Sequence, residues 1–501
     1  MKILLVQPSP FEPGRIGLEN TIWFCEPVAL TSIAAMVPEH EVRILDMRLE
    51  TEVTLNRVLA EFRPALVGTT SMTTDCYQAK AVLQTAKDTL GDKCFTIVGG
   101  HHPTLMPEDF FDPCVDALCV GEGEETFREL VSALAQQRSR GELDEIAGLL
   151  LRRADGSYHR TAKRAQIRAL DTLPAPARHL IDRYRAEYFF TVAGPMASIA
   201  TSRGCSFDCN FCAIWEFYER KTRFLSAKVV VDRMEAVSEK FVFFLDDNFL
   251  TNKHRLEALC DEIERRGVKK WWGTQGRADF IANNPELMKR LRDAGLVMVL
   301  SGYESNDEDA LAALLKRSTA DHNRRAAALL RELGIFSTGI FMVRQDFSEE
   351  DFDTLYAHIN DLGIALPLVA ILTPLPGTQL YRARRHELLT EDRRLFDLLH
   401  SVLPTKLPRR RFYERFAEAN RATWESWKKG NGAVLKKRPE FFKDALPGIV
   451  RFVTRAHQYR PILESAETHL RDEVGIIDPE ARMSPAANED AKRRLPVLEV
   501  A

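Results

Sequence analysis

The sequence has no uninterrupted apolar run of about 20 residues, so it offers no candidate for a membrane-spanning helix. Its first residues, Met1–Val6, lack the small-residue cleavage site of a secretory signal. The nine cysteines are odd in number and have no paired framework. A net charge of -3 gives no general attraction for nucleic acid. We therefore expect a cytoplasmic protein without a nucleic-acid partner, whose thiols bind metal rather than form disulfides.

Three of the cysteines are closely spaced. Cys205, Cys209 and Cys212 form a C-x3-C-x2-C run, with Phe211 directly before the last of them. Three thiolates on one loop can hold three irons of a cubane cluster and leave the fourth iron open, as a catalytic metal site requires. A zinc knuckle that lacks one ligand, or three unrelated core cysteines, are the alternatives. Cys94 and Cys260 fall inside predicted elements and are expected in the core.

The cysteine run resembles the signature loop of the radical S-adenosylmethionine (SAM) superfamily. The resemblance implies a 4Fe-4S cluster whose open iron chelates SAM. It also implies that one electron from the cluster cleaves SAM to a 5'-deoxyadenosyl radical.

The first 140 residues alternate short apolar runs with longer amphipathic stretches. The expected strands are Ile3–Val6, Val42–Leu45, Leu66–Thr69, Phe95–Val98 and Ala117–Val120, and the expected helices are Pro27–Val37, Val53–Phe62, Asp75–Leu90 and Glu124–Gln136. This α/β pattern predicts a doubly wound parallel sheet, whose ligands bind beyond the carboxyl ends of the strands. Glycine and hydroxyl residues there allow close approach of a bulky ligand. The alternative is that they are ordinary turn residues.

Two phrases, Val98-Gly-Gly-His-His-Pro-Thr and Val120-Gly-Glu-Gly-Glu-Glu-Thr-Phe, resemble the cobalamin-binding domain found ahead of many radical SAM modules. The resemblance implies cobalamin contacts from Ser71, Thr73, Gly99, Gly100, Gly121 and Glu122.

The sequence departs from the wider cobalamin fold at the lower cobalt ligand. The Asp-x-His-x-x-Gly loop of methionine-synthase-like proteins is absent, and Arg48 stands at the expected histidine position. Because arginine stays protonated and cannot ligate cobalt, we expect the lower cobalt face to be bare or water-bound. His101 and His102 are the alternative ligands.

From Ala197 the strand–helix alternation resumes. The expected strands are Ala197–Thr201, Phe241–Leu245, Trp271–Thr274, Met298–Leu300, Phe336–Phe341 and Val369–Leu372. Six repeats are too few for an eight-fold barrel and fit the partial (β/α)6 barrel of radical SAM enzymes, with the cysteine loop after the first strand.

Polar residues again follow these strands. By resemblance, Asp246 and Asp247 occupy the place of the amine-binding loop for SAM. Arg277 and Glu304 lie where the methionine and ribose groups are usually reached, and Gly377 lies at the adenine end. The alternatives are structural: Asp247 could cap a helix, and Arg277 could pair with Glu304.

The chain after about Ala383 is rich in Arg, Phe and Trp. From Pro404 to Arg460 there are fifteen Lys/Arg against five Asp/Glu. The stretch around His400–Phe416 resembles the corresponding region of cobalamin-dependent radical SAM methylases that act on hopanoids, the hopanoid C-3 methylases above all. Basic residues are interleaved with Trp424, Trp427, Phe441 and Phe442. This pattern would suit a helix that lies on an anionic membrane surface, such as the inner membrane. The alternative is a solvated, positively charged helix face.

Five segments are expected. They are a cobalamin-binding domain (1–145), a hairpin and linker (146–195), a radical SAM barrel (196–383), a helical C-terminal domain (384–475) and a disordered tail (476–501).

The resemblances imply a methyltransferase that uses 4Fe-4S, methylcobalamin and SAM to methylate an unactivated sp3 carbon of a lipid-like substrate, a hopanoid at carbon 3. A reducing protein would donate electrons. Two alternatives stay open: a cobalamin-dependent radical SAM cyclase or rearrangement enzyme without methyl transfer, and a non-catalytic cobalamin or iron–sulfur sensor.

Overall fold

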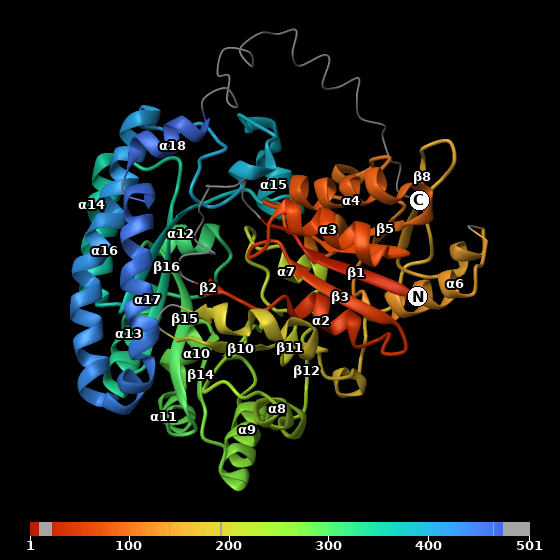
Figure 1. Cartoon of the computed structure of the whole chain (residues 1–501). Coiled ribbons are helices and arrows are strands. Elements are labelled where there is room, and N and C mark those ends of the chain that lie inside the picture. Colours follow the sequence, from red (N-terminus) through yellow and green to blue (C-terminus); the bar gives the residue numbers. More distant parts are fainter. Residues whose placement is uncertain (10–22, 140, 191–192, 464, 474–501) are drawn as a thin grey trace.

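The computed structural model describes residues 1–9, 23–139, 141–190, 193–463 and 465–473. Two parallel sheets form the centre of the molecule, the N-terminal one in red and orange and the second in green (Figure 1). No helix in these ranges is long and apolar enough to cross a membrane. The predicted disordered tail lies outside the described residues.

The N-terminal sheet has the order β3-β1-β4-β5-β6-β7-β8. Its first five strands are parallel, which confirms the predicted doubly wound sheet. Apolar side chains alternate between two cores, one on each face. The strands are β1 (Lys2–Gln7), β3 (Glu41–Asp46), β4 (Leu66–Thr70), β5 (Phe95–Gly99), β6 (Ala117–Cys119), β7 (Leu149–Arg152) and β8 (Tyr158–Arg160), and the helices are α2 (Val28–Ala34), α3 (Glu52–Phe62), α4 (Cys76–Leu90), α5 (His101–Leu105) and α6 (Glu124–Ala135).

The hairpin predicted within 146–195 exists, but it belongs to this sheet. Strands β7 and β8 pair antiparallel around Gly156, and β7 pairs antiparallel with β6. The positive φ of Gly156, +88°, suits the turn. The predicted hairpin therefore extends the N-terminal sheet by two strands.

The second sheet has six parallel strands in sequence order, which confirms the partial barrel. One core lies between its strands and the outer helices, and another fills the barrel interior. The strands are β10 (Met196–Ile199), β13 (Phe241–Phe244), β14 (Trp271–Gln275), β15 (Leu296–Glu304), β16 (Phe336–Val343) and β17 (Leu366–Ile371), and the helices are α8 (Ala227–Glu235), α9 (Lys253–Arg266), α10 (Ala278–Asn283), α11 (Pro285–Asp293), α12 (Glu308–Ala313), α13 (Ala320–Leu333) and α14 (Glu349–Leu362).

Two short antiparallel pairs lie outside the two large sheets. Strand β2 (Trp23–Phe24) pairs with β9 (Phe189–Phe190), and thereby ties the chain after β1 to the chain before β10. Strand β11 (Ser202–Arg203) pairs with β12 (Arg223–Phe224) and closes the loop that carries the three cysteines. Helix α7 (Ile214–Phe217) lies within that loop.

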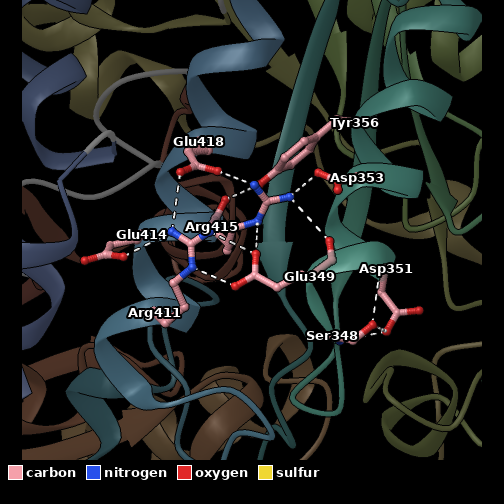
Figure 2. Close-up of polar contacts among 9 residues, drawn as sticks. All are labelled: Ser348, Glu349, Asp351, Asp353, Tyr356, Arg411, Glu414, Arg415 and Glu418. Atoms are coloured by element: carbon pink, nitrogen blue, oxygen red, sulfur yellow. Dashed lines mark hydrogen bonds and ion pairs between the residues drawn. The ribbon is translucent and has the colours of Figure 1, made fainter.

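The chain after the barrel forms α15 (Gln379–Arg384), α16 (Arg409–Lys437), α17 (Pro439–Leu463) and α18 (Ala466–Glu473). Helix α16 packs along α14 on the side of the barrel away from the N-terminal sheet (Figure 1). Figure 2 shows ion pairs between the two helices: Arg415 contacts Glu349 at 3.1 Å and also Asp353, while Arg411 contacts Glu349 at 2.6 Å. Within α16, Arg415 also pairs with Glu418 at 2.6 Å.

The aromatic residues that we expected on a membrane surface differ in their environments. Phe441 is fully buried against Phe241 and Trp271 at the barrel, so the prediction for this side chain is wrong. Phe442 packs partly buried beside it. The side chains of Trp424 and Trp427 lie outside the described residues, as do other side chains within 420–463.

The segment between α15 and α16 returns to the N-terminal sheet. Arg393 Nε donates to Asp109 Oδ2 at 2.7 Å, and the same carboxylate oxygen lies 2.9 Å from His102 Nε2. His102 Nδ1 lies 3.3 Å from Thr73 Oγ1. Burial alone would raise the pKa of Asp109, but the hydrogen bonds from His102 and Arg393 hold it at about 2. This chain of contacts fastens the C-terminal part to the first domain.

Candidate functional site

The three cysteines lie on the loop between β11 and β12, beyond the carboxyl end of β10. Cys209 is buried, and Cys205 and Cys212 are partly buried. Gly204 begins the loop with a φ of +87°, and a Cβ there would overlap the carbonyl oxygen of Lys221. Only glycine fits this conformation without displacing the loop.

The buried environment of the thiols opposes their ionisation. Burial, and then the neighbouring thiols Cys209 and Cys205, raise the pKa of Cys212 to about 12, so a cationic metal centre is needed to ionise it. In a cubane each thiolate binds a different iron, and the three thiols of this loop can supply three such ligands.

Two predicted SAM contacts lie beside the loop. Arg277 stacks on Phe207, with its guanidinium carbon 3.7 Å from the ring centre, and its Nη1 lies 4.0 Å from Cys209 Sγ. Asp247 accepts a hydrogen bond from the Gly204 amide at 2.9 Å, and burial raises its pKa to about 6. Both side chains therefore adjoin the cluster loop, where a zwitterionic ligand of the open iron would lie.

Glu304 lies at the carboxyl end of β15. Its Oε1 accepts from Lys316 Nζ at 2.7 Å, while its Oε2 is buried without a hydrogen-bond partner. Its φ is +57°, an unfavourable backbone conformation that clusters at functional sites. Arg277 pairs with Asp279 at 2.9 Å, so the alternative of an Arg277–Glu304 ion pair is wrong.

Two other predicted SAM contacts, Asp246 and Gly377, have structural roles in the protein. Asp246 is fully buried, accepts from the Thr201 and Ser202 amides at 2.6 and 3.0 Å, and pairs with Arg255 at 3.4 Å. Gly377 has a φ of +85°, and a Cβ there would lie 2.8 Å from Leu105 of α5. Asp246 thus fastens the start of the cluster loop, and Gly377 allows the chain to approach the first domain.

A cavity of about 330 Å³ opens between the carboxyl edge of the N-terminal sheet and the cluster loop. Gly99, Gly100 and Gly121 line it, and space is open where a Gly121 side chain would project. An apolar recess continues toward Gly68 and Phe127. The barrel side is lined by Ala200, Ser202, Arg203, Phe217, Tyr218, Leu245 and Asp247.

This cavity suits a bulky, partly apolar cofactor. Glycines form its edge, the recess is apolar, and His101 Nε2 and Ser202 Oγ are buried beside it without hydrogen-bond partners. Sequence reasoning missed Phe217 and Tyr218. Their position five and six residues after Cys212 was the available signal.

The remaining predicted cobalamin contacts do not line the cavity or are already engaged. Ser71 Oγ donates to Asp75 Oδ1 at 2.8 Å, and Thr73 contacts His102. Glu122 lines the cavity, but both its carboxylate oxygens accept hydrogen bonds from arginines.

The candidate lower ligands have distinct environments. Arg48 forms a two-point pair with buried Asp46, at 2.8 and 2.6 Å, and does not line the cavity. Both ring nitrogens of His102 have protein partners. His101 lines the cavity, packs on Phe217 with ring centres 4.4 Å apart, and has its pKa lowered to about 4 by burial. Its imidazole is therefore neutral at neutral pH.

Comparison with known families covers both sheets. Residues 19–131 match the B12 binding domain, and residues 199–359 match the Radical SAM superfamily. A hopanoid C-3 methylase of Methylococcus capsulatus is 30% identical over 434 residues, which is 85% of this chain and 80% of that protein. An anaerobic magnesium-protoporphyrin IX monomethyl ester cyclase of Rubrivivax gelatinosus is 28% identical over 65% of this chain and 59% of its own length.

Solved structures share the fold. The cobalamin-dependent SAM radical enzyme OxsB, with aqua-cobalamin and SAM bound, superposes with a TM-score of 0.66 at 17% identity, covering 98% of this chain and 75% of that one. The radical SAM methyltransferase TsrM from Kitasatospora setae, with cobalamin and a [4Fe-4S] cluster bound, gives 0.60 at 19% identity, covering 76% of each chain.

Proposed function

Because this chain belongs to the cobalamin-dependent radical SAM methylases, we propose that it methylates an unactivated sp3 carbon of an apolar substrate, specifically a hopanoid at carbon 3. Its cofactors are a 4Fe-4S cluster, cobalamin and SAM. The observation that carries the substrate proposal is the 30% identity with a hopanoid C-3 methylase along 85% of the chain.

The packed apolar core inside the barrel suits chemistry from which water must be excluded. Phe190 stacks on Phe243 with ring centres 4.3 Å apart, and Trp23 stacks on Phe190 at 6.3 Å. Met298 and Leu300 are buried in the same interior core. Saturated hydrocarbon offers neither an acidic proton nor a nucleophilic carbon, so the main contributions that the protein can make are to place the substrate and to exclude water.

The residues around the cysteine loop have separate proposed roles. Cys205, Cys209 and Cys212 hold the cluster, Arg277 binds a carboxylate beside it, and Asp247 binds an amine. Gly99, Gly100 and Gly121 form the floor for the corrin. When bound, the cluster with SAM supplies a hydrogen-abstracting radical, and cobalamin supplies the methyl group. A reducing protein provides the electrons.

The substrate proposal is tested by expressing the gene in a hopanoid-making host that lacks methylated hopanoids. We expect a product heavier by one methylene unit, absent with Cys209→Ala. If the lipids stay unchanged while purified protein still releases 5'-deoxyadenosine from SAM, the hopanoid assignment fails and the methyltransferase assignment stands.

The cyclase relatives make ring formation the second candidate. Product analysis separates the two, because ring formation adds no carbon to the substrate. A sensor would release no 5'-deoxyadenosine under reducing conditions.

We also propose peripheral contact with lipid through α17. Leu446 and Val450 are each 59% exposed, one turn apart on this helix. Flotation with anionic vesicles should carry the wild-type protein upward, and Leu446→Asp should reduce this. Equal flotation of both proteins, or none, would exclude this face as the contact.

A further inference from the structure

The two strands that close the cluster loop present an unfavourable charge pair. In the register of β11 and β12, Arg203 lies directly opposite Arg223. Their side chains are only 19% and 11% exposed. Like charges opposite one another destabilise a strand pair, and partial burial weakens the screening of their repulsion by water. The cluster loop, residues 204–222, is therefore closed by strands that repel each other unless a negative charge lies between them.

The first domain provides this negative charge. Glu122 Oε1 accepts from Arg203 Nη1 at 2.8 Å, and Glu122 Oε2 accepts from Arg223 Nη1 at 2.8 Å. The Ile167 amide donates to the same Oε2 at 2.7 Å. Glu124 adds a second carboxylate to Arg203, at 3.2 Å from Nη1 and in direct contact with Nη2. The two negative charges of Glu122 and Glu124 therefore neutralise the two positive charges of Arg203 and Arg223.

This glutamate loop also lines the cavity. Gly121 has a φ of +87° and open space in front of it, and Gly121, Glu122 and Gly123 all line the cavity. A backbone of this kind can move when a ligand occupies the space, because no side chain fills it. The stretch from Gly121 to Glu124 thus lines the cavity beside Arg203 of β11, and its carboxylates hold the closing strands of the cluster loop.

From this arrangement we propose that Glu122 is a positioning residue that couples occupancy of the cobalamin cavity to closure of the cluster loop. Cobalamin in the cavity fixes the Gly121–Glu124 backbone, and Glu122 then holds Arg203 and Arg223 together. The inference rests on the cofactor assignment above and is independent of the substrate.

Coupling between two sites is reciprocal. If cobalamin stabilises the closed cluster loop, a closed loop with its cluster tightens cobalamin binding by the same factor. Site-to-site coupling typically amounts to about 5- to 150-fold. The consequence is that an empty cobalamin cavity leaves the cluster loop less closed.

Hydrogen exchange of the full-length, anaerobically reconstituted protein tests this coupling, with hydroxocobalamin as the probe. In the wild type, we expect cobalamin to slow exchange across residues 204–222 by at least about 5-fold. Glu122→Gln keeps the shape of the side chain but removes its charge, so it should bind cobalamin and lose most of this protection. Glu129→Gln is the matched control: Glu129 lies on α6, the helix that follows Glu122, and pairs with Arg164 at 3.1 Å.

A second variant keeps the test decisive if Glu122→Gln folds poorly. Glu122→Gln combined with Arg223→Met removes the repulsion together with the carboxylate, so the loop should close with or without cobalamin. Cobalamin-induced protection in Glu122→Gln equal to that of the wild type would overturn the proposal. A further increase in protection on adding cobalamin to the double variant would overturn it as well. If the wild type cleaves no SAM, the proposed function fails instead, and the two failures are distinguishable.

Discussion

At the scale of single residues, the cluster cysteines differ from the other thiols in their neighbours. Cys209 is near Arg277, and Cys212 is near Cys205 and Cys209. Cys260 lies in the barrel core, where burial raises its pKa to about 11. The three loop cysteines can therefore serve as ligands, whereas Cys260 serves packing.

Replacing Cys209 with Ala should abolish SAM cleavage and the visible iron–sulfur absorbance, because one iron loses its ligand. Cys260→Ala should leave both intact. Anaerobic reconstitution followed by absorption spectra and 5'-deoxyadenosine assay gives the measurement. A wild-type spectrum from Cys209→Ala would remove this cysteine from the cluster.

The lower face of cobalt should carry no protein imidazole. Arg48 is held by Asp46, and both nitrogens of His102 are occupied within the protein. Paramagnetic resonance of the cob(II)alamin form should show no splitting from an axial nitrogen, and His101→Phe should leave the spectrum unchanged. Nitrogen splitting that disappears in His101→Phe would identify that residue as the ligand.

The cysteine spacing is a local pattern, so the sequence was sufficient to find it. The roles of other strand-end residues depend on distant partners. Asp246 binds Thr201 and Arg255, and Glu122 binds Arg203 and Arg223. A carboxylate after a strand can bind a ligand or such a partner, and no spacing in the sequence distinguishes the two.

At the scale of elements, we expect Arg415 to contribute more than Arg411 to the packing of α16 on α14. The Arg415 side chain is 11% exposed and also packs on Tyr356, 4.9 Å from the ring centre. Arg411 is 40% exposed. Figure 2 shows both within one network.

Arg415→Ala should lower the free energy of unfolding by about 1–2 kcal/mol, through lost ion pairs and lost packing of its aliphatic stem. Arg411→Ala should cost less, because its pairs are more exposed to water and salt. Urea unfolding at low and high salt measures both. Equal losses of unfolding free energy in the two variants would contradict the expectation that the more buried arginine stabilises the helix packing more.

The predicted strands were recovered because buried parallel strands are continuous apolar runs. The role of the C-terminal aromatics could not be predicted in the same way. Phe441 has the apolar character of a membrane-facing residue, yet the barrel provides Phe241 and Trp271 to cover it. A helix sequence shows an apolar face but not which surface covers it.

At the scale of the whole molecule, the contact of Arg393 with Asp109 makes stability depend on pH. The folded pKa of Asp109 is about 2, below its usual 3.8. A depressed carboxyl pKa stabilises the fold above the unfolded value, and this stability is lost as the pH falls from about 4 through 2.

Asp109→Asn should therefore lower the free energy of unfolding at pH 7 by about 1–2 kcal/mol, after allowance for solvent screening. It should also reduce the loss of stability between about pH 4 and 2. Thermal unfolding over this pH range gives the comparison. Glu129→Gln, which removes a carboxylate from a different ion pair, serves as the control. If Asp109→Asn loses as much stability as the wild type between about pH 4 and 2, other carboxyl groups cause that loss.

The same contact has a consequence for the order in which the protein is made. Asp109 and Arg393 are separated by 284 positions. At a synthesis rate of roughly 5–20 residues per second, Asp109 leaves the ribosome about 15–60 seconds before Arg393 exists. The nascent first domain must therefore fold around Asp109 without the ion pair to Arg393. The segment that carries Arg393 then closes onto a domain made well before it, so translation itself leaves an interval in which the cobalamin domain is accessible to its cofactor.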